Sequence, residues 1–221
     1  MTATSDPTPI YQGQFGEFTI TADDRREVLI YRTGLAIAAL CFAIATGLVL
    51  TLADYPLTPW LLTGLYAVFT LALGISLLTI HIYLIILHRF LQACWLIGAI
   101  ASVIVAVKFP TPLVLTVYQQ PWLLFGVGWI FVALTGIFFK EAFCFDRLET
   151  KLLTPLVPMV LLGHMSNLLP LYVEQLLLTI WAGGFLIFAG RKAFQAIPDD
   201  IGDKSVFEHL HQQSKAGSKA A

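Results

Sequence analysis

The stretch YRTGLAIAALCFAIATGLVLTL, from Tyr31 to Leu52, decides the fold. Its only charged residue, Arg32, lies near its start, and the turn Asp54-Tyr55-Pro56 follows it. A helix needs about 20 mostly apolar residues to cross roughly 30 Å of hydrocarbon. This stretch therefore predicts a transmembrane helix.

The same apolar character extends over the whole chain of 221 residues, of which 57% are hydrophobic and 12% charged. An ordinary soluble domain has roughly 45–50% apolar and about 25% charged residues. A soluble fold of this size would expose a large apolar surface to water and would aggregate. The composition therefore indicates an integral membrane protein with the lipid bilayer as its main partner.

Five more segments are long and apolar enough to span, and they run from about 60 to 87, 90 to 107, 122 to 143, 152 to 169 and 172 to 189. The apolar piece from Leu113 to Tyr118 is too short to cross, and we interpret it as interfacial or re-entrant, with a seventh span as the less favoured alternative. The predicted fold is all-α: a polytopic transmembrane helical bundle of about six spans.

The basic residues predict the orientation, because short cytoplasmic loops are enriched in Lys and Arg. With six spans and both termini in the cytoplasm, twelve of the 13 basic residues face the cytoplasm and only Lys108 faces outward. Adding or removing one span would invert every later loop. The chain then divides into a cytoplasmic N-terminal segment (1–30), a transmembrane domain (31–193) and a polar cytoplasmic tail (194–221).

The N-terminal segment contains a helix start, since Thr21 is followed by the acids Asp23 and Asp24. A Thr cap with acids in the first turn predicts a helix that runs into the first span. Before it, residues 11–20 mix Gly with Phe and Tyr, and we expect an ordered lid against the inner loops.

Small residues spaced four apart predict seams between helices of the bundle, with a dimerisation face as the alternative, because close packing drives helix association in lipid. Such stripes are Ala39, Ala43 and Gly47 in the first span and Gly98, Ser102 and Ala106 in the third. We also expect kinks at Pro155 and Pro158 in the fifth span, and burial of the three separated cysteines, Cys41, Cys94 and Cys144.

Two histidines inside predicted spans are the candidates for binding a cofactor. His81 lies on the second span, two turns before His88 and on the same face, and His164 lies on the fifth. At about 1.5 Å per residue their depths differ by about 8 Å, which argues against a facing pair of haem ligands. A neutral His hydrogen-bonded within the bundle is the simpler interpretation, and single-ligand pigment binding is the alternative.

The densest polar cluster is FFKEAFCFDRLETK, from Phe138 to Lys151. The simpler interpretation is an interfacial anchor in which Lys140 snorkels and Glu141 pairs with a basic neighbour, with Arg147 beside aromatic residues. The alternative makes Glu141 a buried acceptor in a transport path or a contact for a partner protein.

Motifs for catalysis are absent from the sequence, which has no HExxH, no Gly-x-Ser-x-Gly and no P-loop. A net charge of −1 without a basic block also argues against nucleic acid as a partner. We therefore expect no enzyme, no metal and no catalytic residue.

Four segments carry a family resemblance: YQGQFGEFTIT from Tyr11, DRREVLIYR from Asp24, EAFCF from Glu141 and LLTPLVPMVLLGH from Leu152. They resemble a family of uncharacterised integral membrane proteins of cyanobacteria and chloroplasts, domain of unknown function 2301. The resemblance covers the chain from Tyr11 to about Phe194, and it implies a plasma or thylakoid membrane in a photosynthetic cell. It assigns no chemistry to any residue.

Two functional hypotheses follow. The first is a non-enzymatic scaffold or assembly factor that contacts other membrane proteins, because buried charges are few and the N-terminal segment looks ordered. The second is a small-solute or proton permease, because His81, Glu141 and His164 are polar and the fifth span is expected to bend. A pigment-binding or haem-binding protein is the remaining alternative.

Overall fold

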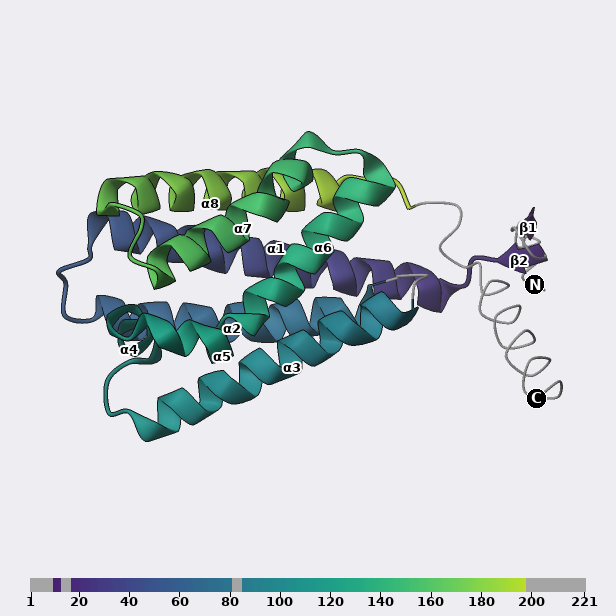
Figure 1. Cartoon of the computed structure of the whole chain (residues 1–221). Coiled ribbons are helices and arrows are strands. Elements are labelled where there is room, and N and C mark those ends of the chain that lie inside the picture. The colour runs from purple at the N-terminus through teal and green to yellow at the C-terminus, as the bar shows by residue number, and fades with distance from the viewer. Residues whose placement is uncertain (1–9, 13–16, 81–84, 198–221) are drawn as a thin grey trace, which may run out of the picture.

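The long helices of the protein pack side by side into a bundle in the computed structural model, which describes residues 10–12, 17–80 and 85–197 (Figure 1). The elements in chain order are β1 (Ile10–Gln12), β2 (Glu17–Thr19), α1 (Ala22–Thr51), α2 (Thr58–Thr79), α3 (Ile85–Lys108), α4 (Leu113–Gln119), the 3₁₀ helix η1 (Pro121–Leu123), α5 (Leu124–Val127), α6 (Trp129–Phe145), α7 (Leu148–Met165) and α8 (Leu171–Ala193).

Helix length and composition support a membrane protein of four to five spans. Helices α1, α2, α3 and α8 are each long and apolar enough to cross, and the pair Pro121–Val127 and Trp129–Phe145, bent by 59°, qualifies as a fifth span if it crosses as one unit. Helix α7 does not qualify, and its first turns hold Glu149 and Lys151. The count of six spans therefore stays a prediction.

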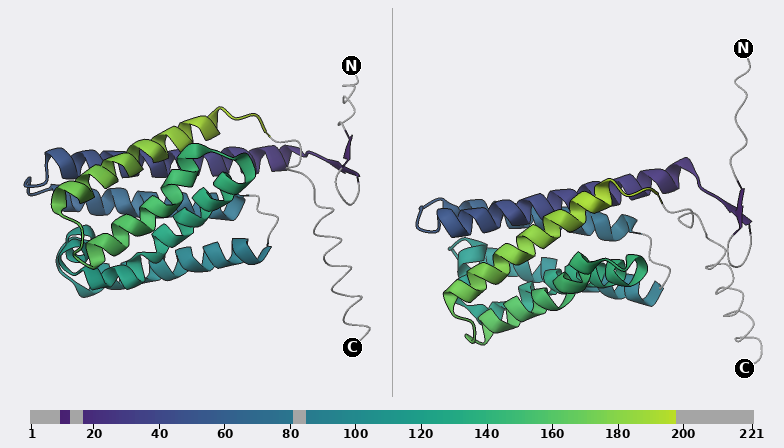
Figure 2. Two further views of the ribbon diagram at one scale, coloured as in Figure 1. Left: turned by 45° about the horizontal axis from the view of Figure 1, so that its top comes forward. Right: turned by 90° about the horizontal axis from the view of Figure 1, so that it is seen from above.

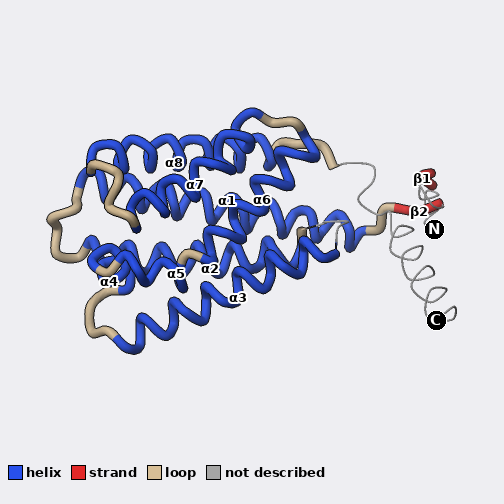
Figure 3. Tube along the Cα trace, viewed as in Figure 1, coloured by secondary structure: helices blue, strands red, loops and turns tan. Residues whose placement is uncertain are grey.

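Successive long helices run in opposite directions through the bundle (Figure 1). The end at which α1 begins and α8 ends, here called the basic end, holds nine of the described basic residues, whereas Lys108 lies at the opposite end, where α3 ends. Figure 3 shows loops at both ends of this bundle. The basic residues are therefore gathered at one end of the fold, as the sequence predicts.

Helix α1 begins where the capping residues predict. The Thr21 side chain accepts from the backbone N–H of Asp24, and the Asp24 carboxylate accepts from the backbone N–H of Thr21 at 2.9 Å. This reciprocal capping satisfies two backbone donors of the first turn. The helix therefore begins nine residues before the predicted span, at Ala22.

The segment before α1 forms a β-hairpin, which an all-α description leaves out. Strands β1 and β2 are antiparallel, with Tyr11 opposite Phe18 and their rings stacked at 5.7 Å. Figures 1 and 2 place this hairpin beyond the start of α1 and away from the bundle. The expected lid against the inner loops is therefore wrong, because the hairpin extends the line of α1 instead of folding back.

The boundary between the second and third spans differs from the prediction. Helix α2 ends at Thr79, and α3 already begins at Ile85, so a single helix to residue 87 is wrong. His88 therefore belongs to α3, where its Nε2 lies 2.7 Å from the Leu77 carbonyl oxygen of α2. His81 lies outside the described residues. The apolar run around Ile80 contains no Pro or Gly, so hydropathy alone passes over the break.

The predicted fourth span is broken rather than straight. A 3₁₀ turn begins at Pro121, and the bend of 59° falls at Gly128, between α5 and α6. The piece from Leu113 to Tyr118 lies in a separate short helix, α4, which packs against α2, and its interpretation as interfacial or re-entrant stays a prediction. Helix α7 is continuous through Pro155 and Pro158 and begins earlier than predicted, at Leu148.

Pairs of helices approach each other closely at glycine residues, and some of these glycines are not the ones that the sequence predicted. A Cβ on Gly34 of α1 would meet the Ser76 hydroxyl and lie 2.7 Å from the Ala72 carbonyl oxygen of α2. Gly98 of α3 similarly lies against the backbone of Ile130 in α6, which confirms part of the third-span seam. Gly47, by contrast, is exposed, and a Cβ there would have no neighbour within 4 Å, so this member of the predicted first-span seam packs against no other helix of the described chain.

Other residues of the predicted seams are likewise buried in some cases and exposed in others. Ala39 and Ser102 are buried, whereas Ala106 is exposed. Among the cysteines, Cys41 and Cys94 are buried as expected, but Cys144 is exposed because it lies on the outer face of α6 near its end.

Candidate functional site

A fully buried carboxylate stands at the centre of the basic end. Glu141 of α6 has no exposed surface, and its Oε2 accepts from Lys192 Nζ of α8 at 2.8 Å. Its Oε1 accepts from Lys140 Nζ at 3.0 Å and from the Tyr31 hydroxyl of α1 at 3.2 Å. Both oxygens are therefore occupied by donors from three helices, and we call these four residues the Glu141 cluster.

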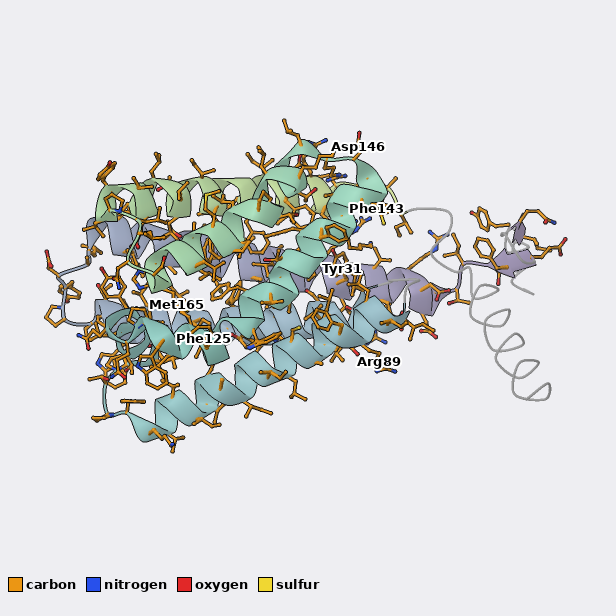
Figure 4. The ribbon with its side chains drawn as sticks, viewed as in Figure 1. Tyr31, Arg89, Phe125, Phe143, Asp146 and Met165 are labelled. Carbon is orange, nitrogen blue, oxygen red and sulfur yellow. The ribbon has the colours of Figure 1, made fainter. Side chains whose placement is uncertain are left out.

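Tyr31 connects the Glu141 cluster to a fourth helix. Its side chain is buried on α1, and its backbone carbonyl accepts from the Ser76 hydroxyl of α2 at 3.0 Å. Figure 4 shows Tyr31 inside the bundle, with Phe143 and Asp146 toward the same end. The carboxylate thus links α6 and α8 to the pair of helices α1 and α2.

Three cations surround one aromatic ring beside Glu141. Lys192 Nζ lies 4.2 Å from the Phe145 ring centroid, Lys140 Nζ lies 5.5 Å from it, and the Arg147 guanidinium carbon lies 5.8 Å from it. An aromatic face attracts cations, most strongly where water is excluded. The Phe145 ring therefore helps to stabilise three neighbouring positive charges, of which the single negative charge of Glu141 neutralises only a part.

Arg147 ties the turn between α6 and α7 to the end of α8. Its Nη2 donates to the Gln195 side-chain oxygen at 3.1 Å, and Arg32 of α1 donates to the Gln195 backbone carbonyl at 2.5 Å. Asp146, in the same turn, adopts a left-handed backbone with φ of 49° and pairs with Lys151. The residues that follow α8 are thus held against α1 and α7.

The opposite end of the bundle has a smaller polar group around His164. Its Nδ1 lies 3.1 Å from the Glu174 carboxylate of α8, and its ring stacks on Tyr118 of α4 at 5.2 Å between centroids. His164 lies in the last turn of α7, near the end of the bundle and not in its middle, and its side chain is 21% exposed. Glu174 therefore has a partner that the sequence analysis did not assign to it.

The structure brings together the three predicted cluster residues, Lys140, Glu141 and Arg147, and keeps His164 apart from them. Glu141 pairs with a basic neighbour as predicted, but Lys140 turns inward to the carboxylate and is only 15% exposed instead of snorkelling. The sequence analysis missed Tyr31 and Lys192. From its sequence position, Lys192 could equally be an interfacial anchor at the end of the last span. Only the three-dimensional packing, which brings α8 to α6, shows that it pairs with Glu141.

Metal binding finds no support in the part of the chain that the structure describes, which contains no group of three or more His, Cys, Asp and Glu side chains able to hold an ion. The assignment of His81 and His164 as cofactor ligands stays a prediction, since His81 is outside the described residues.

Comparison with known proteins adds the family. The model of a family described as uncharacterised integral membrane protein (DUF2301) matches residues 75–209, which is more than half of the chain. No curated protein and no solved structure matches. The match includes the quoted segments from Glu141 and Leu152, whereas those from Tyr11 and Asp24 precede it. The chain belongs to the DUF2301 family of integral membrane proteins.

Proposed function

We propose that the protein is a non-enzymatic scaffold or assembly factor that holds other membrane proteins at its basic end. The observation that supports this most is the saturation of Glu141. Both carboxylate oxygens are occupied by donors from α1, α6 and α8, and the side chain has no exposed surface. A carboxylate bound in this way fixes helices relative to one another.

A permease would use Glu141 differently. A group that takes up and releases a proton or cation needs access to water and freedom to exchange partners, whereas two lysines lie within 3.0 Å of this carboxylate. Of the other two polar residues of the permease hypothesis, His164 is engaged with Glu174 at the opposite end of the bundle, and His81 lies outside the described residues. These pairings favour packing over transport.

The topology we propose has six spans with both termini in the cytoplasm, counting the bent pair α5–α6 as one crossing and α7 as another. It is supported by the alternating helix directions and by the basic residues gathered at one end (Figure 1). Single cysteines at Asp54, Pro110 and Asn167 should then react with an impermeant thiol reagent added outside. Labelling of any one of them from the cytoplasmic side only would contradict this topology.

The membrane we propose is the plasma or thylakoid membrane of a photosynthetic cell, and the resemblance of the quoted segments supports it. We expect partners to be other membrane proteins rather than nucleic acid.

Purification from native membranes tests the scaffold. A tagged chain extracted in mild detergent should retain a membrane-protein partner in a fixed ratio, and the partner should accumulate less when the chain is deleted. Recovery of the chain alone would contradict the proposal. Solute or proton flux in vesicles that Glu141→Gln abolishes would favour the permease instead, and a Soret or chlorophyll band would favour a cofactor role.

A further inference from the structure

Positive charge exceeds negative charge around the turn between α6 and α7. Lys140, Arg147 and Lys192 are 15%, 12% and 6% exposed, and all three lie around the Phe145 ring. Arg32 and Arg191 lie beside them, the latter 3.0 Å from Glu149. Two carboxylates, Glu141 and Glu149, pair with members of this group of five cations. Among the described residues these cations therefore outnumber the carboxylates paired with them, and a bound anion would restore the balance.

Two guanidinium groups in this region are held in place yet keep unused donors. Arg32 and Arg147 both bond to Gln195, through its backbone and its side-chain oxygen. Arg32 Nε and Arg147 Nη1 are nevertheless buried without a hydrogen-bond partner. Glu149 Oε1, which is also buried without a hydrogen-bond partner, lies 3.9 Å from Arg147 Nη1, close enough for an ion pair but too far for a hydrogen bond. Buried charged donors without partners are unfavourable, so both groups are prepared to receive an acceptor.

Oxyanions suit these donors. Guanidinium groups bind phosphate and sulfonate oxygens through several parallel N–H groups. Arg147 is also the N-cap residue of α7, an 18-residue helix that has no side-chain cap, so its first backbone N–H groups and its dipole favour negative charge at the same place.

Exposed apolar side chains flank the arginines and point to a lipid rather than a free anion. Phe143 is 84% exposed and Leu148 is 68% exposed, on either side of the turn that contains Arg147. Figure 4 shows Phe143 and Asp146 at this edge of the bundle. Basic pockets between helices on the cytoplasmic side bind anionic headgroups, while acyl chains pack on neighbouring apolar residues.

We propose that Arg32 and Arg147, aligned by Gln195, bind the phosphate or sulfonate headgroup of one anionic lipid, whose acyl chains contact Phe143 and Leu148. The site takes one lipid per chain, and its selectivity is for the negative headgroup over a zwitterionic one. It lies next to the Glu141 cluster but does not depend on a scaffold role.

Native mass spectrometry of the purified chain tests this site, with mixed micelles that contain phosphatidylglycerol or phosphatidylcholine. We expect one retained phosphatidylglycerol, at least ten-fold weaker retention in the double variant R32Q/R147Q, and unchanged retention in Arg89→Gln. Arg89 is the matched control, because it is a basic-end arginine on α3 that bonds to Gln92 (Figure 4). Arg147→Lys, which keeps the charge but loses the fork, should weaken retention less.

Three results would overturn the proposal. Equal retention of phosphatidylcholine by the unmodified chain would remove the headgroup selectivity, whether or not any variant folds. Equal weakening by Arg89→Gln would show a general charge effect. Displacement of the lipid by inorganic phosphate at equal concentration would show a site for a free anion instead of a lipid.

Discussion

Paired replacement of Glu141 and Lys192 with methionine should cost less stability than the two single replacements together. In the single variant Glu141→Met, two lysines that are 6% and 15% exposed lose their carboxylate. Breaking a buried ion pair from one side costs about 3–5 kcal/mol, since the remaining charge stays buried and unpaired.

The opposite single replacement should be milder. In Lys192→Met the carboxylate keeps Lys140 at 3.0 Å and Tyr31 at 3.2 Å. The loss is then that of one charge-assisted hydrogen bond, about 1.5–3 kcal/mol.

In the double variant the buried pair disappears as a unit. Lys140 can turn toward water, and the unmatched Tyr31 hydroxyl leaves a cost of about 1–3 kcal/mol. The two single replacements together cost about 4.5–8 kcal/mol and the double about 1–3 kcal/mol, so the two sites should couple by about 3.5–5 kcal/mol, with the double variant more stable than the sum of the singles predicts.

The free energy of unfolding of all four proteins, measured by denaturant titration in mixed micelles, gives this coupling. The matched control is the Asp146–Lys151 pair of the neighbouring turn, whose side chains are 86% and 50% exposed. Exposed pairs of this kind contribute little, so its cycle should show no measurable coupling. Additive effects at Glu141 and Lys192, within about 0.5 kcal/mol, would refute a structural role for the carboxylate.

Further predictions concern the packing around this cluster. Gly34→Ala should destabilise the chain by about 1–3 kcal/mol, because the new methyl group meets the backbone of α2 and the Ser76 hydroxyl, whereas Gly47→Ala, with open space, should not. Thermal unfolding in detergent compares the two, and equal effects would contradict the packing. Tyr31→Phe removes one bond to Glu141 and should lower stability by about 1 kcal/mol in the same assay, and no loss would contradict that bond.

Hydropathy predicted the apolar helices well and their breaks poorly. The start of α1 follows from Thr21 and Asp24, because capping depends on residues three apart in the sequence. The end of α2 at Thr79 and the bend at Gly128 lie within apolar runs, where composition does not change across the break. Such breaks depend on how neighbouring helices pack, and the sequence of one apolar segment does not reveal that packing.

The sequence identified the central acid of the site but not the residues that bind it. Glu141 stands out because an acid within an apolar run needs a counter-charge. Lys192 follows it by 51 positions and Tyr31 precedes it by 110, and both pairings depend on helix crossings. Small residues four apart likewise occur on lipid-facing and packed faces alike, so Gly47 was mistaken for a contact and Gly34 was missed.

Quantitative purification of the tagged chain from native membranes, with and without the E141M/K192M replacement, tests the central claim most directly. If the Glu141 cluster fixes the helices of a scaffold, the unmodified chain retains the partner in a fixed ratio, and the double variant, which lacks both the carboxylate and Lys192, retains less of it. Recovery of the unmodified chain without any fixed-ratio partner would contradict the account.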